Sequence, residues 1–299
     1  MTIRIPPVVL LSCLLSACTQ DNFWISSHAY LDQAPPGEVP QRFTPPHLCD
    51  SGYFPIGRIA FSADGKEFYF GSNNEWYSNR HQQLNWFRFV NNRWQGPLLL
   101  NHLYGQPTFS IDGKLLYVTD NNGIHQMHRT DTGWSKPEPF LKRSYVLYNY
   151  MPVKSGRAYV GSNGTWGQAN DAGSWKFAVM PANPLDSSIK NLGAPLNSTG
   201  FNGDLYIAPD ESYMIISAKE TKDYECELWI SFRRANDTWT APLSLGAAIN
   251  DGLAHRFGQY VTPDGKYLFY IKGTSDKDCW LYWVRFDGLL AKMKQQAGL

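Results

Sequence analysis

Seven polar side chains lie at comparable places along the chain and are suited to binding a ligand. They occur in five segments that each lead into a predicted strand, at residues 49–58, 102–106, 145–149, 197–204 and 255–259. The seven are Tyr53, Arg58, Gln106, Asn149, Asp204, His255 and Arg256. Their phenol, guanidinium, amide, carboxylate and imidazole groups together can hydrogen-bond a sugar or a peptide. We predict that they form the binding set; the alternative is that they bind only backbone and water.

The sequence contains none of the common catalytic motifs. It has no Gly-x-Ser-x-Gly nucleophile elbow, no His-Glu-x-x-His pair and no Gly-rich phosphate loop. Asp64, Asp112, Asp210 and Asp264 recur, but each begins a tight turn, where an aspartate caps backbone N–H groups. Catalytic residues therefore stay unassigned, and no cofactor is expected.

One pattern recurs about every 50 residues: an apolar stretch, a turn centred on Asp-Gly-Lys or a variant of it, and a second apolar stretch. The copies span Phe61–Phe70, Phe109–Val118, Met151–Val160, Ile207–Ile216 and Val261–Tyr270, and Ser155 replaces the aspartate in the middle copy. A strand, an Asp-Gly turn and a second strand form a β-hairpin. A period of this length predicts a repeat fold.

A second pair of strands follows three of these hairpins and closes on a tryptophan and a proline. These closing segments are Trp94–Pro97, Trp134–Pro137 and Trp239–Pro242. Four antiparallel strands in fifty residues make one blade of a β-propeller. We expect the three tryptophan rings to pack between neighbouring blades.

The fifth copy ends before its fourth strand, because only a short helical tail, 289–299, remains after Cys279–Val284. Gln41–Pro45, near the other end of the chain, has an aromatic-x-Pro pattern that imitates these Trp-x-x-Pro segments. We predict that this strand completes the last blade and removes the open edge. The predicted fold is an all-β propeller of four-stranded antiparallel blades, with five blades favoured and six as the alternative, closed by the N-terminal strand.

The hairpins resemble the WD40-like PD40 repeats of TolB-type propellers, which share a Ser-Pro-Asp-Gly-Lys core. The resemblance covers about residues 35–286, is close over Asp210–Val284 and is loose in the third blade. TolB-type domains usually have six blades, whereas this chain has five copies. The resemblance implies the fold and an extracytoplasmic setting, and it implies no particular activity.

A metal-dependent enzyme is the alternative to a binding protein. The motifs His102-x-x-x-Gln106 and His255-x-x-x-Gln259 have the same spacing. This pair of motifs resembles the metal site of propeller lyases that act on pectin fragments, in which histidines and a glutamine hold a divalent metal. The number of residues from each histidine to the next repeated aspartate differs by one between the two copies. The remaining metal ligands of those lyases are missing from this sequence. No metal is predicted, and His102 and His255 are the candidates if one binds.

The first eighteen residues have the pattern of a processing signal. Ile5–Ala17 follows Arg4 and is uncharged, mostly apolar and too short to span a bilayer as a helix. The tetrad from Leu15 to Cys18 resembles the bacterial lipobox. This resemblance implies a diacylglyceryl group on the Cys18 sulfur, cleavage after Ala17 and acylation of the new amino group, as with palmitate. The alternative is an ordinary cleaved secretory peptide.

Thr19, in place of Asp after the cysteine, resembles the outer-membrane sorting pattern. We therefore expect a lipid-anchored protein of the cell envelope that faces the periplasm. Residues 18–38 are polar and proline-rich and are expected to form a tether, with the propeller over 39–288 and the tail over 289–299. Removal of residues 1–17 and lipidation leave Cys49, Cys226 and Cys279, so at most one disulfide can form.

The net charge of +1, with acids and bases scattered along the chain, argues against nucleic-acid binding. Contact with a membrane is expected through the lipid alone, and the protein is expected to be a monomer. We predict a binding or scaffold module for an envelope protein, a peptide or a glycan. The alternative is a carbohydrate-active lyase or hydrolase whose site lies at the channel mouth.

Overall fold

A computed structural model describes most of the chain after residue 21. The described residues are 22–49, 52–76, 80–120, 123–141, 147–162, 176–181, 189–197, 204–219, 221, 223 and 225–299. The predicted signal peptide and the lipidation residue Cys18 lie outside them. Within these ranges, no helix has the length and apolar character needed to cross a bilayer.

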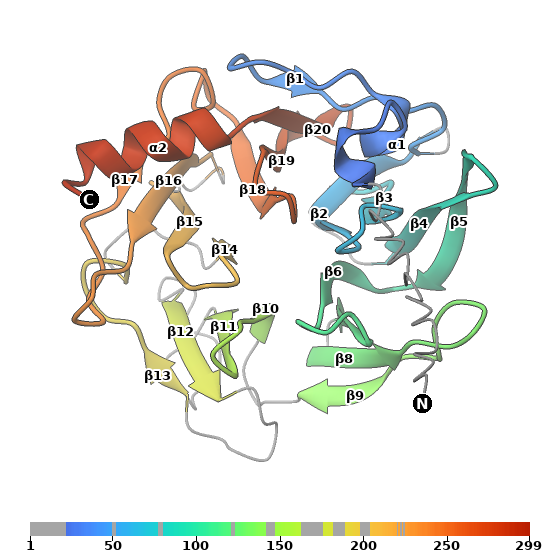
Figure 1. The fold of residues 1–299 in the computed structure, drawn as a ribbon, viewed down its shortest axis with the longest axis horizontal. Helices are drawn as coiled ribbons and strands as arrows, with labels where there is room; N and C mark the ends of the chain where they lie inside the picture. Colours follow the sequence, from blue (N-terminus) through green and yellow to red (C-terminus); the bar gives the residue numbers. More distant parts are fainter. Residues whose placement is uncertain are drawn as a thin grey trace, which may run out of the picture.

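Five four-stranded antiparallel sheets stand around a central axis, as Figure 1 shows. The first blade contains β2 (Phe54–Phe61), β3 (Glu67–Asn73), β4 (Gln83–Val90) and β5 (Arg93–His102). The second contains β6 (Gly105–Phe109), β7 (Leu115–Asp120), β8 (Gly123–His128) and β9 (Glu138–Leu141). The third contains β10 (Leu147–Pro152), β11 (Arg157–Ser162), β12 (Lys176–Pro181) and β13 (Lys190–Asn191). The fourth contains β14 (Leu205–Ile207), β15 (Tyr213–Ala218), β16 (Glu227–Phe232) and β17 (Leu243–Ser244). The fifth contains β18 (His255–Val261), β19 (Tyr267–Ser275) and β20 (Asp278–Arg285). The predicted five-bladed propeller is confirmed.

The repeated aspartates close the turn between the first two strands of their blades. In the first blade, Asp64 Oδ1 accepts hydrogen bonds from Ser62 Oγ at 2.6 Å and from the Lys66 amide at 3.1 Å. The same two bonds recur at Asp112 and Asp264. These carboxylates are therefore occupied by the turns, because Asp side chains satisfy backbone N–H groups there.

The N-terminal strand completes the fifth blade. β1 (Gln41–Arg42) pairs antiparallel with β20, and the Phe43 amide donates to the Leu281 carbonyl at 2.7 Å. The ring of Phe43 is buried, with its centroid 5.1 Å from those of Phe269 and Trp283. The predicted closure by this strand is confirmed, and it leaves the fifth sheet with four strands.

The segment before β1 differs from the expected free tether. It forms a 3-10 turn, η1 (Phe23–Ile25), and a short helical turn, α1 (Ala29–Asp32), that cover the junction of the first and fifth blades. Trp24, Tyr30 and Leu31 are buried there. The physical reason is hydrophobic burial: aromatic side chains within a polar, proline-rich stretch find an apolar surface on the propeller.

Two of the three closing tryptophans pack across blade junctions as predicted, whereas the prediction is wrong for Trp94. Trp134 of the second blade donates from Nε1 to the Tyr69 hydroxyl of the first at 2.8 Å, and Trp239 of the fourth lies edge-on to Tyr159 of the third. Trp94 of the first blade instead contacts Phe23 and donates to the His28 carbonyl of the N-terminal segment. The N-terminal segment therefore takes the place that a neighbouring blade takes elsewhere in the ring.

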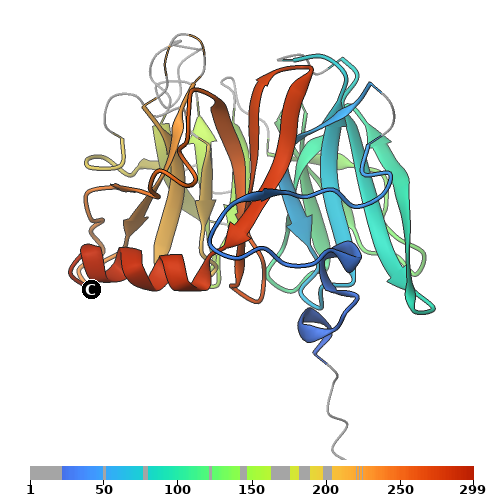
Figure 2. The same ribbon diagram turned by 90° about the horizontal axis from the view of Figure 1, so that it is seen from above.

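The disc has two different faces (Figure 2). We call the face that carries the hairpin turns at residues 62–65, 110–113 and 262–265 the turn face, and the opposite one the loop face. Helix α2 (Asp287–Gln296) and the N-terminal segment lie on the turn face. No disulfide joins the cysteines of the described ranges.

Candidate functional site

The innermost strands crowd the axis at one level, where four of them contain a bulge. The pairing of β2, β6, β10 and β18 with the next strand shifts register there. Gly57, Gln106, Asn149 and Gly258 have positive φ at these bulges. A Cβ at Gly258 would collide with the Gly57 carbonyl, so only glycine allows the first and fifth blades to approach this closely.

Side chains from the five blades join into one hydrogen-bonded layer at this level. Arg58 donates from Nη1 to Asn149 Oδ1 at 2.9 Å and from Nη2 to the Thr108 hydroxyl. Asn149 donates from Nδ2 to Asp204 Oδ1 at 2.7 Å, and its amide donates to Gln106 Oε1 at 3.2 Å.

The fifth blade completes the layer through Gln259, whose Nε2 donates to the Asp204 carbonyl at 2.8 Å. We call these six residues the axial layer. They are Arg58, Gln106, Thr108, Asn149, Asp204 and Gln259.

Burial governs the charges in the axial layer. It lowers the pKa of Arg58 to about 10, although the Asp204 carboxylate and two tyrosines oppose this shift. Burial also raises the pKa of Asp204, against the hydrogen bond from Asn149 and the charge of Arg58. Arg58 is still protonated at neutral pH, so a cation lies on the axis.

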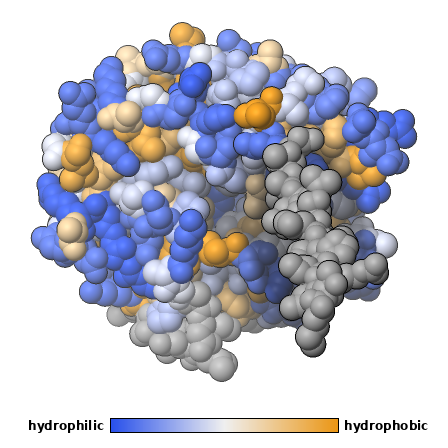
Figure 3. Space-filling model, in the orientation of Figure 1, coloured by the Kyte–Doolittle hydropathy of each residue, from blue (hydrophilic) through white to orange (hydrophobic). Residues whose placement is uncertain are grey.

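A cavity of about 530 Å³ lies on the turn-face side of Arg58. Its lining comes from the innermost strands near the hairpin turns, from the turns themselves, from the start of β15 and from α2. Tyr206, Tyr213 and Tyr260 contribute to its wall, and Lys154 and Lys294 also line it. In the space-filling view of this face the molecule is hollowed near the axis (Figure 3). The volume is within the range of small-molecule and peptide sites.

One donor atom of Arg58 has no acceptor among the described residues. Its side chain lines the cavity and is 1% exposed, and Nε has no hydrogen-bond partner among the described residues. Within the same residues Arg58 forms no ion pair, since Asn149 lies between it and Asp204. An unpaired donor on a buried cation is costly, and an acceptor that reached Nε would remove that cost.

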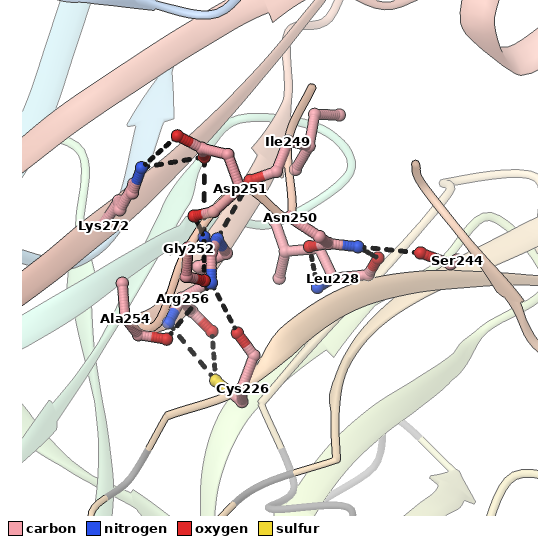
Figure 4. Close-up of polar contacts among 10 residues, drawn as sticks. All are labelled: Cys226, Leu228, Ser244, Ile249, Asn250, Asp251, Gly252, Ala254, Arg256 and Lys272. Atoms are coloured by element: carbon pink, nitrogen blue, oxygen red, sulfur yellow. Dashed lines mark hydrogen bonds and ion pairs between the residues drawn. The ribbon is translucent and has the colours of Figure 1, made fainter. Parts of the chain in front are cut away.

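Arg256 was predicted in the same set but lies in a different environment (Figure 4). Nε donates to the Ile249 carbonyl at 2.9 Å, Nη1 to those of Cys226 and Ala254, and Nη2 to that of Gly252 at 3.1 Å. Its guanidinium therefore fixes the loop that enters the fifth blade.

Three further candidates lie apart from the axial layer. His255 packs its ring 4.3 Å from that of Phe257 and 6.3 Å from that of Trp76, and burial lowers its pKa to about 4. His102 is exposed at the end of β5, the outermost strand of its blade. Tyr53 is half-buried just before β2. Among the residues that the structure describes, no group of three or more His, Cys, Asp or Glu side chains is placed to hold a metal ion.

Four predicted residues do come together, and their spacing explains why. Arg58, Gln106, Asn149 and Asp204 each lie six positions before the turn residue of their blade, which is Asp64, Asp112, Ser155 or Asp210. The fifth blade has Gly258 at that position, and the neighbouring Gln259 supplies the polar group instead. Sequence reasoning missed Thr108 and Gln259 as members of the layer, although the fixed offset could have indicated this part of the fifth blade.

Comparison with solved structures gives the fold a context. A putative TolB from Agrobacterium tumefaciens shares 14% identity with this chain, with a TM-score of 0.48 over 78% of this chain and 77% of that one. TolB from Acinetobacter baumannii shares 14% identity, with a TM-score of 0.42 over 77% of this chain and 54% of that one. Trypanosoma rangeli sialidase, in complex with the inhibitor DANA, shares 15% identity, with a TM-score of 0.45 over 80% and 46%.

TolB-type propellers are thus among the structural neighbours, as the repeat resemblance predicts. At these identities the likeness concerns the propeller architecture alone. No protein-family model matches the sequence, and no curated protein matches it.

Proposed function

We propose that this protein is a lipid-anchored binding module of the bacterial cell envelope, whose axial cavity receives an acidic group of a protein, peptide or glycan. The anchor is the lipid on Cys18, and the propeller faces the periplasm from the outer membrane. The observation that carries the binding role is the buried Arg58 guanidinium at the inner end of the cavity, with Nε unpartnered in the described chain.

The shape of the site supports binding of a group that enters from the turn face. Hydrogen bonds to Asn149 and Thr108 of the axial layer hold Arg58, so a fixed cation forms part of the cavity wall. Carboxylates and phosphates form short, charge-assisted bonds with guanidinium groups. The tyrosine wall offers apolar surface and ring faces to the rest of the ligand.

The enzyme alternative required His102, His255, Asp204 and Arg58 to share one site. Arg58 and Asp204 are joined through Asn149, whereas His102 lies on an outer strand and His255 packs on aromatic rings. Asp204 does not line the cavity. This arrangement favours a binding role over acid–base chemistry.

Capture of partners from detergent-solubilised envelope tests the binding role. The baits are the wild-type protein, Arg58→Met and Arg285→Met, which removes an exposed arginine that pairs with Asp287 at 2.8 Å. We expect one set of partners on the wild type and on Arg285→Met, and its loss on Arg58→Met. Equal capture by all three baits would contradict a role for the cavity.

Matched small probes test the chemistry. One pair is the tripeptide Ala-Ala-Phe with a free carboxylate and the same peptide as its amide; the other is galacturonate and galactose. We expect calorimetry to give an affinity at least about tenfold higher for the acid of the better-binding pair, since a charge-assisted bond contributes about 1.5–3 kcal/mol. Equal affinity for acid and neutral forms would exclude the proposed role of Arg58.

The lipid anchor has its own test, Cys18→Ser followed by fractionation and mass measurement. We expect the wild type in the membrane pellet with the added acyl mass, and the variant in the supernatant. A variant that stays in the pellet with the wild-type mass would refute acylation.

A further inference from the structure

The N-terminal segment is fixed to the turn face by specific contacts. Trp24 donates from Nε1 to the Ala63 carbonyl at 3.0 Å, in the first hairpin turn. Its ring lies so close to Gly65 that a Cβ there would clash. The Tyr30 hydroxyl donates to Asp264 Oδ2 at 2.6 Å, in the last hairpin turn. The chain is therefore held to both turns well before β1 begins.

Within the described residues the attachment extends back to Asn22, very close in sequence to the lipidation residue. The Asn22 side chain caps η1 by accepting from the Trp24 amide at 3.2 Å. Only residues 19–21 separate Cys18 from Asn22. Four Cα–Cα steps span at most about 14 Å, even when fully extended. Of the expected tether of residues 18–38, only residues 19–21 can therefore separate the lipid from the propeller, and we call these residues the leash.

The opposite face of the disc lies beyond the reach of this leash. β2 has eight residues and runs between the two faces, a rise of roughly 26 Å at 3.3 Å per residue. Helix α2 lies on the same face as the N-terminal segment (Figure 2), and residues of α2 and of the hairpin turns line the cavity. Two large apolar side chains also project there: Ile25, which is 72% exposed, and Ile111, which is 49% exposed.

We propose that the turn face, with the mouth of the axial cavity, is held against the surface of the bilayer that contains the lipid anchor. This inference rests on the proposed acylation of Cys18. The leash sets the orientation, and Ile25 and Ile111 contact the headgroup region, where amphipathic and apolar groups bind. The cavity then opens toward the membrane, and its ligand enters from that side.

A pair of fluorescent reporters tests the orientation. Ile111→Cys places a thiol on the turn face, and Leu253→Cys places one in the loop before β18 on the loop face, where Leu253 is 76% exposed. Both are made in a Cys49→Ser background, because Cys226 and Cys279 are buried. The full-length acylated protein is labelled with bimane and reconstituted into phosphatidylethanolamine–phosphatidylglycerol vesicles that carry a nitroxide on the headgroup.

We expect the label at position 111 to lose most of its fluorescence and the label at position 253 to keep it. Equal quenching, or stronger quenching at position 253, would overturn the orientation while leaving the anchor intact. If mass measurement finds no acyl group on Cys18, the anchor and the orientation both fail, so the two failures are distinguishable.

A lengthened leash provides the matched control. Twenty Gly and Ser residues inserted between Thr19 and Gln20 add a flexible span of roughly 25 Å. We expect this variant to remain on the vesicles and to lose the quenching at position 111. Quenching that is unchanged by the insertion would overturn the role of the short leash.

Discussion

Arg58 and Arg256 are both 1% exposed, yet their surroundings differ. Arg256 donates to the carbonyls of Ile249, Ala254 and Gly252 in the approach to the fifth blade, and to that of Cys226, just before β16 of the fourth blade. Arg58 donates to two side chains on other blades and lines a cavity, and its Nε has no partner within the part of the chain that the structure describes. The Arg256 guanidinium donates its hydrogen bonds to the backbone. The Arg58 guanidinium has a donor atom, Nε, for which the described residues provide no acceptor.

The difference teaches that burial alone does not identify a binding residue. A buried cation whose donors all reach backbone carbonyls stabilises the loop that supplies them. A buried cation with an unused donor and an adjacent cavity is paired incompletely, and a ligand can complete the pairing. The two arginines therefore predict different results when each is removed.

The largest expected effect is the loss of stability in Arg256→Met. Removing the guanidinium leaves several buried carbonyls without donors, so we expect the free energy of unfolding to fall by about 3–5 kcal/mol. Urea denaturation measures this change. Arg285→Met is the matched control, and its urea midpoint should stay at the wild-type value. A fall in the Arg256→Met variant no larger than that of the control would contradict the structural role.

His255, next to Arg256, gives the next effect through pH. Burial lowers its pKa to about 4, so the unfolded chain binds the proton more readily than the folded protein. The contribution to stability is complete above about pH 6.5 and is lost as the pH falls toward 4, by up to about 3 kcal/mol. His255→Phe should flatten this part of the profile of unfolding free energy against pH. An unchanged slope would show that His255 titrates normally.

Arg58→Met should separate binding from stability. Losing two hydrogen bonds is offset by removing a desolvated charge, so we expect a stability change of no more than about 1 kcal/mol. The affinity for the acidic probe should fall at least about tenfold, because the charge-assisted bonds are lost. Calorimetry on the variant measures the affinity. An affinity equal to that of the wild type would show that the ligand binds elsewhere.

The smallest effects concern two aspartates with opposite shifts. Burial raises the pKa of Asp204, so its charged form costs stability that increases as the pH rises above about 3.9. Asp204→Asn should therefore be more stable than the wild type at pH 7, and the gain should vanish in acid. Denaturation at a series of pH values measures it.

Asp210 is the control, because its pKa is shifted in the opposite direction from that of Asp204. Burial acts to raise its pKa, but hydrogen bonds from the Ser212 side chain and amide lower it overall. Asp210→Asn should be less stable than the wild type at pH 7, and the difference should shrink below about pH 3.9. If the stability at pH 7 changed in the same direction in both variants, the contrast between a turn-capping carboxylate and a buried axial carboxylate would be contradicted.

Local signals made the propeller predictable from sequence. An Asp-Gly turn between apolar runs specifies a hairpin without information from distant residues, and three such turns with two variants of them, at Ser155 and Asp210, favoured the five blades that the structure has. The closing strand was predictable because the pair Phe43 and Pro45 imitates, at a spacing one residue shorter, the tryptophan and proline that close other blades. Docking of Trp24 and Tyr30 was not predicted, because their partners Ala63 and Asp264 are far away in the sequence.

The binding site was less predictable because strand geometry is sensitive to single residues. Successive side chains of a strand point to opposite faces, and a bulge reverses that alternation. The bulge at Gly258 brings Gln259 to the axial layer, while Arg256 binds the loop before β18. The opening of the cavity toward the turn face depends on α2 and on Tyr206 and Tyr260 of different blades, which no single motif encodes.

Nitrogen-15 NMR of the arginine side chains tests the central claim most directly, because buried Nε–H groups of Arg58 and Arg256 can be followed in one spectrum. Each is assigned through its Met variant, and the wild type is then titrated with whichever acid the calorimetry selects and with its neutral counterpart. We predict that the acid shifts the Arg58 Nε–H signal, that the neutral probe does not, and that the Arg256 signal stays in place. An acid that binds without moving the Arg58 signal, or that moves only the Arg256 signal, would contradict the account.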